Sequence, residues 1–360
     1  MAKKVWNRQT SSDGKEYMVH ADNKYPPKLI SDNGRFLHIG PDQKDPIQYL
    51  LKHAPFMSVD DLFGCKDRAA FHDLLETIYH EELGIDRAVF QANNVKDPPI
   101  LYNLYPKWYQ DRDAWWLYSQ DEYAFETLHC NLHVTAPVSK NGKFDDKHSM
   151  IYILQHQLEF LDYDQKDSFK ILDLCSGMGL TTLVLAKRFP NSTVYYNELN
   201  QGTRRVFKRL LDISGLTNVI MLDKEEIDVD VDVLCAFEAV EHIQHDTIPK
   251  TGQPFPWFDK FLNKLKDDGH LIYYTMWNAE FNPKTGHKVL GHFREYDFDG
   301  EIIGHDPNKN GGKVTWDKDF RKCLNRRGLY NMSGRTGLGY KGHVFFFNWG
   351  PRLFMKTQKK

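Results

Sequence analysis

The chain has 360 residues, which is enough for two domains that each bury a hydrophobic core of ordinary size. Its formal net charge of −2 gives no bulk-charge signature of nucleic-acid binding, and no run of 18 apolar residues predicts a membrane span. The five cysteines include no C-x-x-C pair, which argues against a disulfide framework or a zinc ribbon. The N-terminal stretch 1–6 lacks the apolar core of a signal peptide, so we expect a cytoplasmic protein.

The first 146 residues are predicted to form a mainly helical domain that covers the substrate side. Residues 1–45 are polar and are expected to be irregular. Apolar residues then recur at helical spacing, at Ala70, Phe71, Leu74, Leu75, Ile78 and Tyr79. An aromatic-rich segment, 107–129, predicts a further helix. The composition changes over residues 137–146, where we place the boundary with a second domain, 147–360.

From residue 147 the pattern alternates between helix and strand. Strands are predicted to end at Asp173, near Glu198, at Asp223 and at Phe237, and a fifth covers residues 270–275. Segments 342–347 and 352–355 are expected to pair as an antiparallel hairpin. Repeated βα units predict an α/β fold, in which a mostly parallel, Rossmann-like sheet carries helices on both faces.

A strand, a glycine-rich turn and a helix follow one another over residues 169–189. Gly177 and Gly179 allow positive φ angles and leave room for a ligand. Glu198 follows Gly179 by 19 residues (198 − 179), at the tip of the next strand, where a carboxylate can accept hydrogen bonds from ribose hydroxyls. This arrangement predicts a nucleoside cofactor. An ordinary βα turn without a ligand is the alternative.

The turn, Asp173-Leu-Cys175-Ser-Gly177-Met-Gly179, resembles the first motif of class I S-adenosylmethionine (SAM) methyltransferases, with cysteine in the first glycine position. A dinucleotide fingerprint would require glycine at Thr182. The resemblance spans about residues 148–360 and implies SAM-dependent methyl transfer. It implies that Asp223 faces the adenine amino group, although acids at strand ends also commonly cap helices. The full implied cofactor set is Asp173, Cys175, Gly177, Gly179, Glu198, Leu222, Asp223 and Phe237.

An E-x-x-E-H tract follows the fourth strand. On a helix, Glu238, Glu241 and His242 would share one face, and such a donor set suits Mg²⁺ or Mn²⁺. The alternative is a helix start whose acids cap the helix and whose histidine packs in the core.

Segments 276–282, 305–306 and 314–320 resemble the Hen-type small-RNA 3′-terminal 2′-O-methyltransferases. That resemblance implies a metal held by Glu238, Glu241, His242 and His305, which grips the terminal hydroxyls of RNA. His305 precedes its neighbouring acid instead of following it, so His287 and His292 are rival fourth ligands. Coordination would lower the pKa of the hydroxyl, and His242 or His305 could take its proton if it is not a ligand.

Other classes stay open. A small-molecule hydroxyl (of a metabolite or sugar) is the nearest alternative substrate, followed by DNA methylation and by a SAM-binding module without activity. The tetrad Asp97-Pro-Pro-Ile100 resembles the D-P-P-Y of DNA amino-methyltransferases, but Ile100 replaces the stacking aromatic, which favours a loop turn. Four basic residues are expected on the outer face of one helix: Arg204, Arg205, Lys208 and Arg209. These side chains would either contact phosphate groups or face solvent.

Overall fold

The structure is a computed structural model, and it describes the chain in segments. These are residues 6–10, 16–20, 62–66, 68–88, 90, 124, 154, 158, 161, 163, 166–223, 227–237, 239, 255–274, 324–331 and 352–357. The chain forms two compact units. One contains residues 55–155 and 164–226, and the other contains residues 1–54, 156–163 and 227–360.

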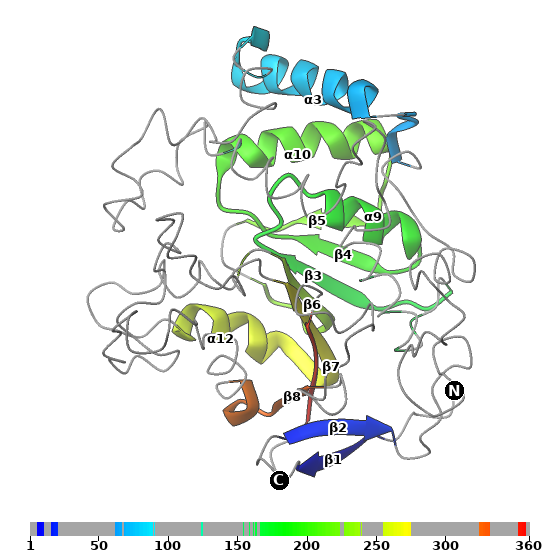
Figure 1. Ribbon diagram of the computed structural model, residues 1–360, viewed down its shortest axis with the longest axis vertical. Coiled ribbons are helices and arrows are strands. Elements are labelled where there is room, and N and C mark those ends of the chain that lie inside the picture. The colour runs from blue at the N-terminus through cyan, green and yellow to red at the C-terminus, as the bar shows by residue number, and fades with distance from the viewer. Residues whose placement is uncertain are drawn as a thin grey trace, which may run out of the picture. The chain divides into compact units, whose positions relative to one another are not determined.

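The first unit contains three parallel strands. They are β3 (Lys170–Leu174), β4 (Thr193–Tyr196) and β5 (Val219–Met221), with α9 (Leu180–Arg188) and α10 (Gln201–Ser214) in the connections (Figure 1). The register pairs Asp173 with Tyr196 and Tyr196 with Met221, so the three strands end level with one another. This part of the chain confirms the predicted parallel α/β arrangement.

The local sequence explains these elements. Strand β3 is buried on both faces, as expected for a strand covered by helices, and its apolar residues Ile171, Leu172 and Leu174 are fully buried. Helix α10 is amphipathic, and Asn200 caps its N-terminus, because its Oδ1 accepts a 2.7 Å hydrogen bond from the Thr203 amide. Gly215 follows the last helical residue and has the left-handed conformation that is common after a helix.

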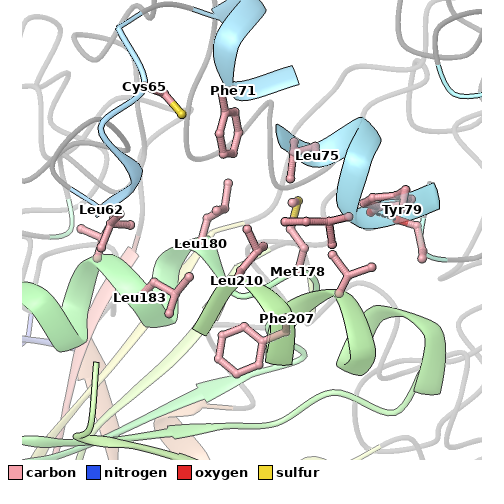
Figure 2. Close-up of a cluster of buried hydrophobic side chains, with 14 of the residues drawn as sticks. Leu62, Cys65, Phe71, Leu75, Tyr79, Met178, Leu180, Leu183, Phe207 and Leu210 are labelled. Atoms are coloured by element: carbon pink, nitrogen blue, oxygen red, sulfur yellow. Dashed lines mark hydrogen bonds between the residues drawn. The ribbon is translucent and has the colours of Figure 1, made fainter. Parts of the chain in front are cut away.

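Helix α3 (Arg68–Leu83) lies along α10 in the same unit (Figure 1). Its buried residues Phe71, Leu75 and Tyr79 share one hydrophobic cluster with Met178 of the glycine turn and Phe207 of α10 (Figure 2). Helix α3 confirms the prediction of a helix from the spacing of apolar residues in this segment. A residue between the two motif glycines therefore belongs to a core that the N-terminal part of the chain completes. The predicted boundary at residue 146 lies outside the described residues.

The second unit contains a mixed set of strands. They are β6 (Val231–Phe237), β7 (Leu265–Tyr274), β8 (Leu329–Asn331), β9 (Arg352–Lys356), β1 (Trp6–Thr10) and β2 (Glu16–His20), with α12 (Phe255–Lys264) before β7. Strand β6 is parallel to β7, and β9 is antiparallel to both β7 and β8. An antiparallel strand near the end of the chain was expected. Its described neighbours are β7 and β8, whereas residues 342–347 lie outside the described part.

Strands β1 and β2 correct one expectation. They form an antiparallel hairpin, and β2 pairs in parallel with β8, where the polar sequence had predicted irregular structure. Strand pairing satisfies backbone groups whatever the side chains, so a polar strand leaves little trace in a hydrophobic pattern. The mainly helical N-terminal domain is thus not confirmed as a whole. Within the described segments, no helix is both long and apolar enough to cross a membrane.

We predict that Gly179→Ala destabilises the protein more than Gly215→Ala. Both glycines have positive φ angles, 75° and 66°, so alanine strains the backbone at either position by about 1 kcal/mol. A Cβ on Gly179 would lie 2.0 Å from Cδ2 of Phe207, whereas a Cβ on Gly215 would meet no atom within 4 Å. Overpacking should add about 1–3 kcal/mol at Gly179. Urea unfolding of both variants measures the difference, and equal losses would contradict the packing role.

Candidate cofactor site

The turn between β3 and α9 alternates left-handed residues. Cys175, Gly177 and Gly179 have φ angles of 52°, 56° and 75°. Cys175 therefore adopts the left-handed conformation that glycine adopts most easily, at a cost of about 1–2 kcal/mol. At Gly179 the missing side chain makes room for the ring of Phe207, so packing alone already requires glycine there.

Glu198 holds this turn through backbone amides. Its Oε2 accepts a 2.9 Å hydrogen bond from the Gly177 amide, and its Oε1 accepts from Leu199 and Asn200 at 2.7 and 2.9 Å. The residue is buried, and burial raises the pKa of its carboxyl, while the three amides and nearby Arg204 act in the opposite direction. Oε1 has two donors and Oε2 has one, which leaves one acceptor position for a ligand hydroxyl. The predicted ribose contact stays a prediction, and this geometry offers it one hydrogen bond.

Tyr196 holds the other side of the same glycine. Its hydroxyl donates a 2.7 Å hydrogen bond to the carbonyl of Gly177, and its ring stacks on Phe207 with centroids 3.7 Å apart. The side chain is fully buried, and burial raises the pKa of the phenol. Sequence reasoning missed this residue, because its aromatic character reads equally well as an ordinary core position.

Asp173 lies beneath the turn at the end of β3. Its Oδ2 accepts a 2.6 Å hydrogen bond from the hydroxyl of Thr182, in the first turn of α9, and its backbone carbonyl accepts one from the hydroxyl of Ser176. Burial raises the pKa of Asp173 to about 7, although hydrogen bonds from Thr182 and Ser176 oppose the shift. This carboxyl therefore fastens α9 to β3, whether or not it also contacts a cofactor.

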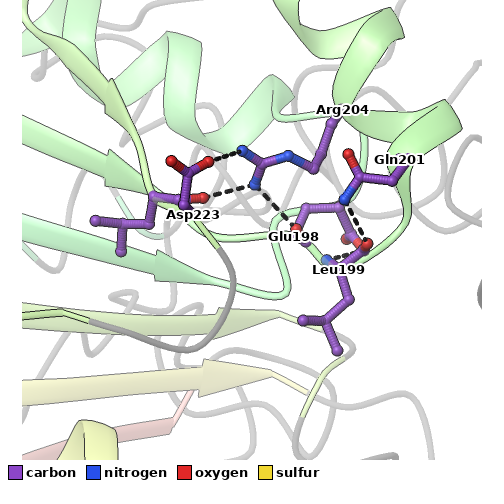
Figure 3. Close-up of polar contacts among 6 residues, drawn as sticks. Glu198, Leu199, Gln201, Arg204 and Asp223 are labelled. Atoms are coloured by element: carbon purple, nitrogen blue, oxygen red, sulfur yellow. Dashed lines mark hydrogen bonds and ion pairs between the residues drawn. The ribbon is translucent and has the colours of Figure 1, made fainter.

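Arg204 joins the ends of β4 and β5 (Figure 3). One of its guanidinium nitrogens donates to the carbonyls of Glu198 and Leu222, at 3.1 and 2.6 Å, and the other lies 3.3 Å from Oδ1 of Asp223. The Arg204 side chain is only 12% exposed, so the expectation that it faces outward is wrong. Asp223, by contrast, is fully exposed at the edge where the strands end.

The other three basic residues of α10 also have intramolecular partners. Arg205 donates to the carbonyl of Glu82, and Arg209 pairs with the carboxylate of Glu81 at 3.5 Å, both in α3. Lys208 pairs with Asp212 one helical turn onward. These contacts join α10 to α3 across their exposed sides. Binding of phosphate groups by these basic residues remains a prediction.

The remaining predicted residues belong to the other unit or lie outside the described residues. Phe237 is buried at the end of β6 in the other unit. The predicted metal ligands Glu238, Glu241, His242 and His305, and the rivals His287 and His292, lie outside the described residues. Among the residues that are described, no three side chains of metal-binding type are grouped. The metal site therefore stays a prediction.

Proteins similar to this chain are found among the solved structures. No protein-family model matches it, and no curated protein matches it. It is similar to an rRNA methylase from Streptococcus thermophilus, at 16% identity and a TM-score of 0.33 over 57% of this chain and 96% of that one. A SAM-dependent methyltransferase from Aquifex aeolicus matches at 14% identity and a TM-score of 0.36, over 56% of this chain and 88% of that one. The [4+2]-cyclase SpnF matches at 12% identity and a TM-score of 0.39, over 66% of this chain and 94% of that one.

Because the pKa of Asp173 is raised, the stability of the protein should depend on pH. Because its folded value of about 7 lies above the ordinary value of about 4, the native state holds a proton that the unfolded state loses between these pH values. The free energy of unfolding should therefore fall as pH rises from 5 to 7, by up to about 1.4 kcal/mol per pH unit from this group. Asp173→Asn removes the titration and keeps an acceptor for Thr182.

Urea unfolding at several pH values measures both proteins. The difference in unfolding free energy between variant and wild type should move in favour of the variant as pH rises. A difference that stays constant from pH 5 to pH 7 would show that Asp173 titrates normally.

Proposed function

We propose that this chain is a SAM-dependent methyltransferase. The observation that carries the proposal is the level edge of β3, β4 and β5. The turn at Gly177, which Glu198 holds, follows β3. The buried carboxylate of Glu198, with one acceptor position, follows β4, and the exposed carboxylate of Asp223 follows β5. Ribose hydroxyls are donors that suit Oε2 of Glu198, and the adenine amino group is a donor that suits Asp223. This geometry and the motif from Asp173 to Gly179 together support SAM as the cofactor.

Thr182 favours SAM over a dinucleotide. In a dinucleotide fingerprint a third glycine lets the helix pack closely on the strand. Here Thr182 occupies that position, fully buried, and its hydroxyl binds Asp173. The contact between helix and strand is therefore polar and specific. SAM also lacks the pyrophosphate for which a dinucleotide turn is built.

Bound SAM supplies an electrophilic methyl group. The acceptor we propose is a hydroxyl, and an RNA 2′-hydroxyl is slightly favoured over that of a small molecule, on the strength of the Hen-type resemblance. In this proposal Glu238, Glu241, His242 and His305 hold Mg²⁺ or Mn²⁺. A hydroxyl is a poor nucleophile at neutral pH, so a protein that methylates it needs a Lewis acid or a base beside the oxygen.

The cofactor assignment is tested with two matched acids. Asp223→Ala and Asp212→Ala each remove one exposed carboxylate paired with a basic residue of α10, but only Asp223 lies at the strand ends. Isothermal titration should show SAM affinity about tenfold weaker in Asp223→Ala, because a charged acceptor is lost, and less than about twofold weaker in Asp212→Ala. The assignment of Asp223 fails if both variants bind SAM as the wild type does.

The substrate assignment is tested by tritium transfer from labelled SAM to a short single-stranded RNA. Parallel reactions contain a chelator, or the same RNA with its 3′-terminal ribose oxidised. We expect transfer that requires both the metal and the intact terminal diol. Transfer that survives chelator would remove the metal from the proposal. No transfer, by a protein that binds SAM, would move the acceptor to a small hydroxylated molecule or DNA.

A further inference from the structure

A cavity of about 560 Å³ lies in the second unit, where β7 begins. Its walls come from the C-terminal half of α12, the start of β7, the segment that leads into β8 and the end of β9. Leu262 and Leu329 are the apolar part of its lining, and the other lining residues are polar or charged. The far end of β7 pairs with the end of β6, which the predicted metal tract follows. The cavity is therefore separate from that tract.

Two cations of the lining hold its walls together. Arg327 forms a fork with Asp259, in which Nε and Nη2 donate to the two carboxylate oxygens at 2.6 and 3.2 Å. Lys356 donates to the carbonyl of Leu262, at 3.0 Å, and to that of Leu265. The fork joins α12 to the segment before β8, and the lysine joins the end of α12 to β9. The cavity is thus preformed, as small-molecule sites usually are, and its volume lies within their range of roughly 300–1,000 Å³.

Several lining side chains retain hydrogen-bonding capacity. An ammonium has three protons, and within the described part of the chain the contacts of Lys356 use two of them. The side chains of Asn263 and Asp267 are exposed, and among the described residues neither takes part in a hydrogen bond. Arg326 is also exposed and brings guanidinium donors to the same lining. The cavity therefore offers donors together with one carboxylate acceptor.

The charges of the lining favour an anion that also carries hydroxyls. The lining has three cations and two carboxylates, a net charge of +1 (3 − 2). Donors on Arg326, Lys356 and Asn263 suit the oxygens of a phosphate group. Burial lowers the pKa of Lys356, so a phosphate beside it would stabilise its charged form. An ionised Asp267 only accepts hydrogen bonds, and a hydroxyl next to the phosphate would supply the donor.

We propose that this cavity binds a ribose phosphate group, whose phosphate accepts hydrogen bonds from Arg326 and Lys356 and whose hydroxyl donates to Asp267. Asn263 is a further donor to the phosphate. An RNA strand and a free nucleotide both carry this group. The proposal goes beyond the function proposed above and does not depend on it, because no residue of the glycine turn or of the predicted metal tract takes part.

The phosphate contact is tested with two matched cations. Arg326→Met and Lys266→Met each remove one exposed cation, but only Arg326 lines the cavity, whereas Lys266 pairs with Asp232. In isothermal titration, Arg326→Met should bind ribose 5-phosphate about tenfold more weakly than the wild type, because a charged donor is lost. Lys266→Met should lose less than about twofold. Equal affinities in the two variants, or no binding by the wild type, would overturn the proposal.

The hydroxyl contact is tested with two matched acids. Asp267 and Asp230 both oppose the lowering of the pKa of Lys356, but only Asp267 lines the cavity. The probes are ribose 5-phosphate and methyl phosphate, which lacks the sugar. The wild type and Asp230→Ala should bind ribose 5-phosphate about tenfold more tightly than methyl phosphate, and in Asp267→Ala this preference should fall below about threefold. A wild type that binds both probes equally would overturn the assignment of ribose.

A labelled single-stranded uridine hexamer distinguishes the two sources by fluorescence anisotropy. Either source supports the cavity assignment. An RNA strand is indicated if Arg326→Met weakens binding of the hexamer and ribose 5-phosphate competes with it. A free nucleotide is indicated if Arg326→Met weakens binding of ribose 5-phosphate alone. SAM is titrated in parallel, and its affinity should be the same in the wild type and all four variants. A protein that does not bind SAM would contradict the proposed function and leave the test of the cavity intact.

Discussion

The buried carboxylate of Glu198 is the constraint on which the rest of the site depends. A charged group in the interior is tolerated only when donors surround it, and Glu198 has three backbone amides. Two of them start the loop that leads into α10, and the third belongs to the glycine turn. Satisfying one side chain therefore fixes the distance between the ends of β3 and β4. The same bonds leave a single acceptor position at Oε2, so the acid can serve a ligand without releasing the turn.

Local pattern was enough to predict the strand, turn and helix that begin at Asp173, and also helix α3. Hydrophobic spacing and glycine position are properties of neighbouring residues, and they survive in a single sequence. The level ends of β3, β4 and β5 also follow from the order of βα units. The strand ends near Asp173, Glu198 and Asp223 were placed this way, although their roles as ligands stay predictions.

The contacts that give the site its geometry could not be predicted in this way. The hydrogen bond from Tyr196 to Gly177 depends on the register of β4 beside β3, and the clash that requires glycine at 179 depends on the rotamer of Phe207. The residues adjacent in sequence carry no pattern from which either contact could be predicted. The β1–β2 hairpin was missed for a related reason, since its pairing with β8 joins segments from opposite ends of the chain.

In the proposed function, cofactor binding and metal chemistry would be carried by different residues. The bonds that hold the glycine turn lie within β3, β4, α10 and the segments between them, whereas the predicted metal tract follows β6. The hydrogen bonds that hold the turn, among the residues that the structure describes, come from Glu198, Tyr196 and Asn197. Binding of SAM alone therefore does not separate an active enzyme from a module that only binds the cofactor. Dependence of transfer on the metal tract separates them, because the chemistry that activates a hydroxyl would be located there.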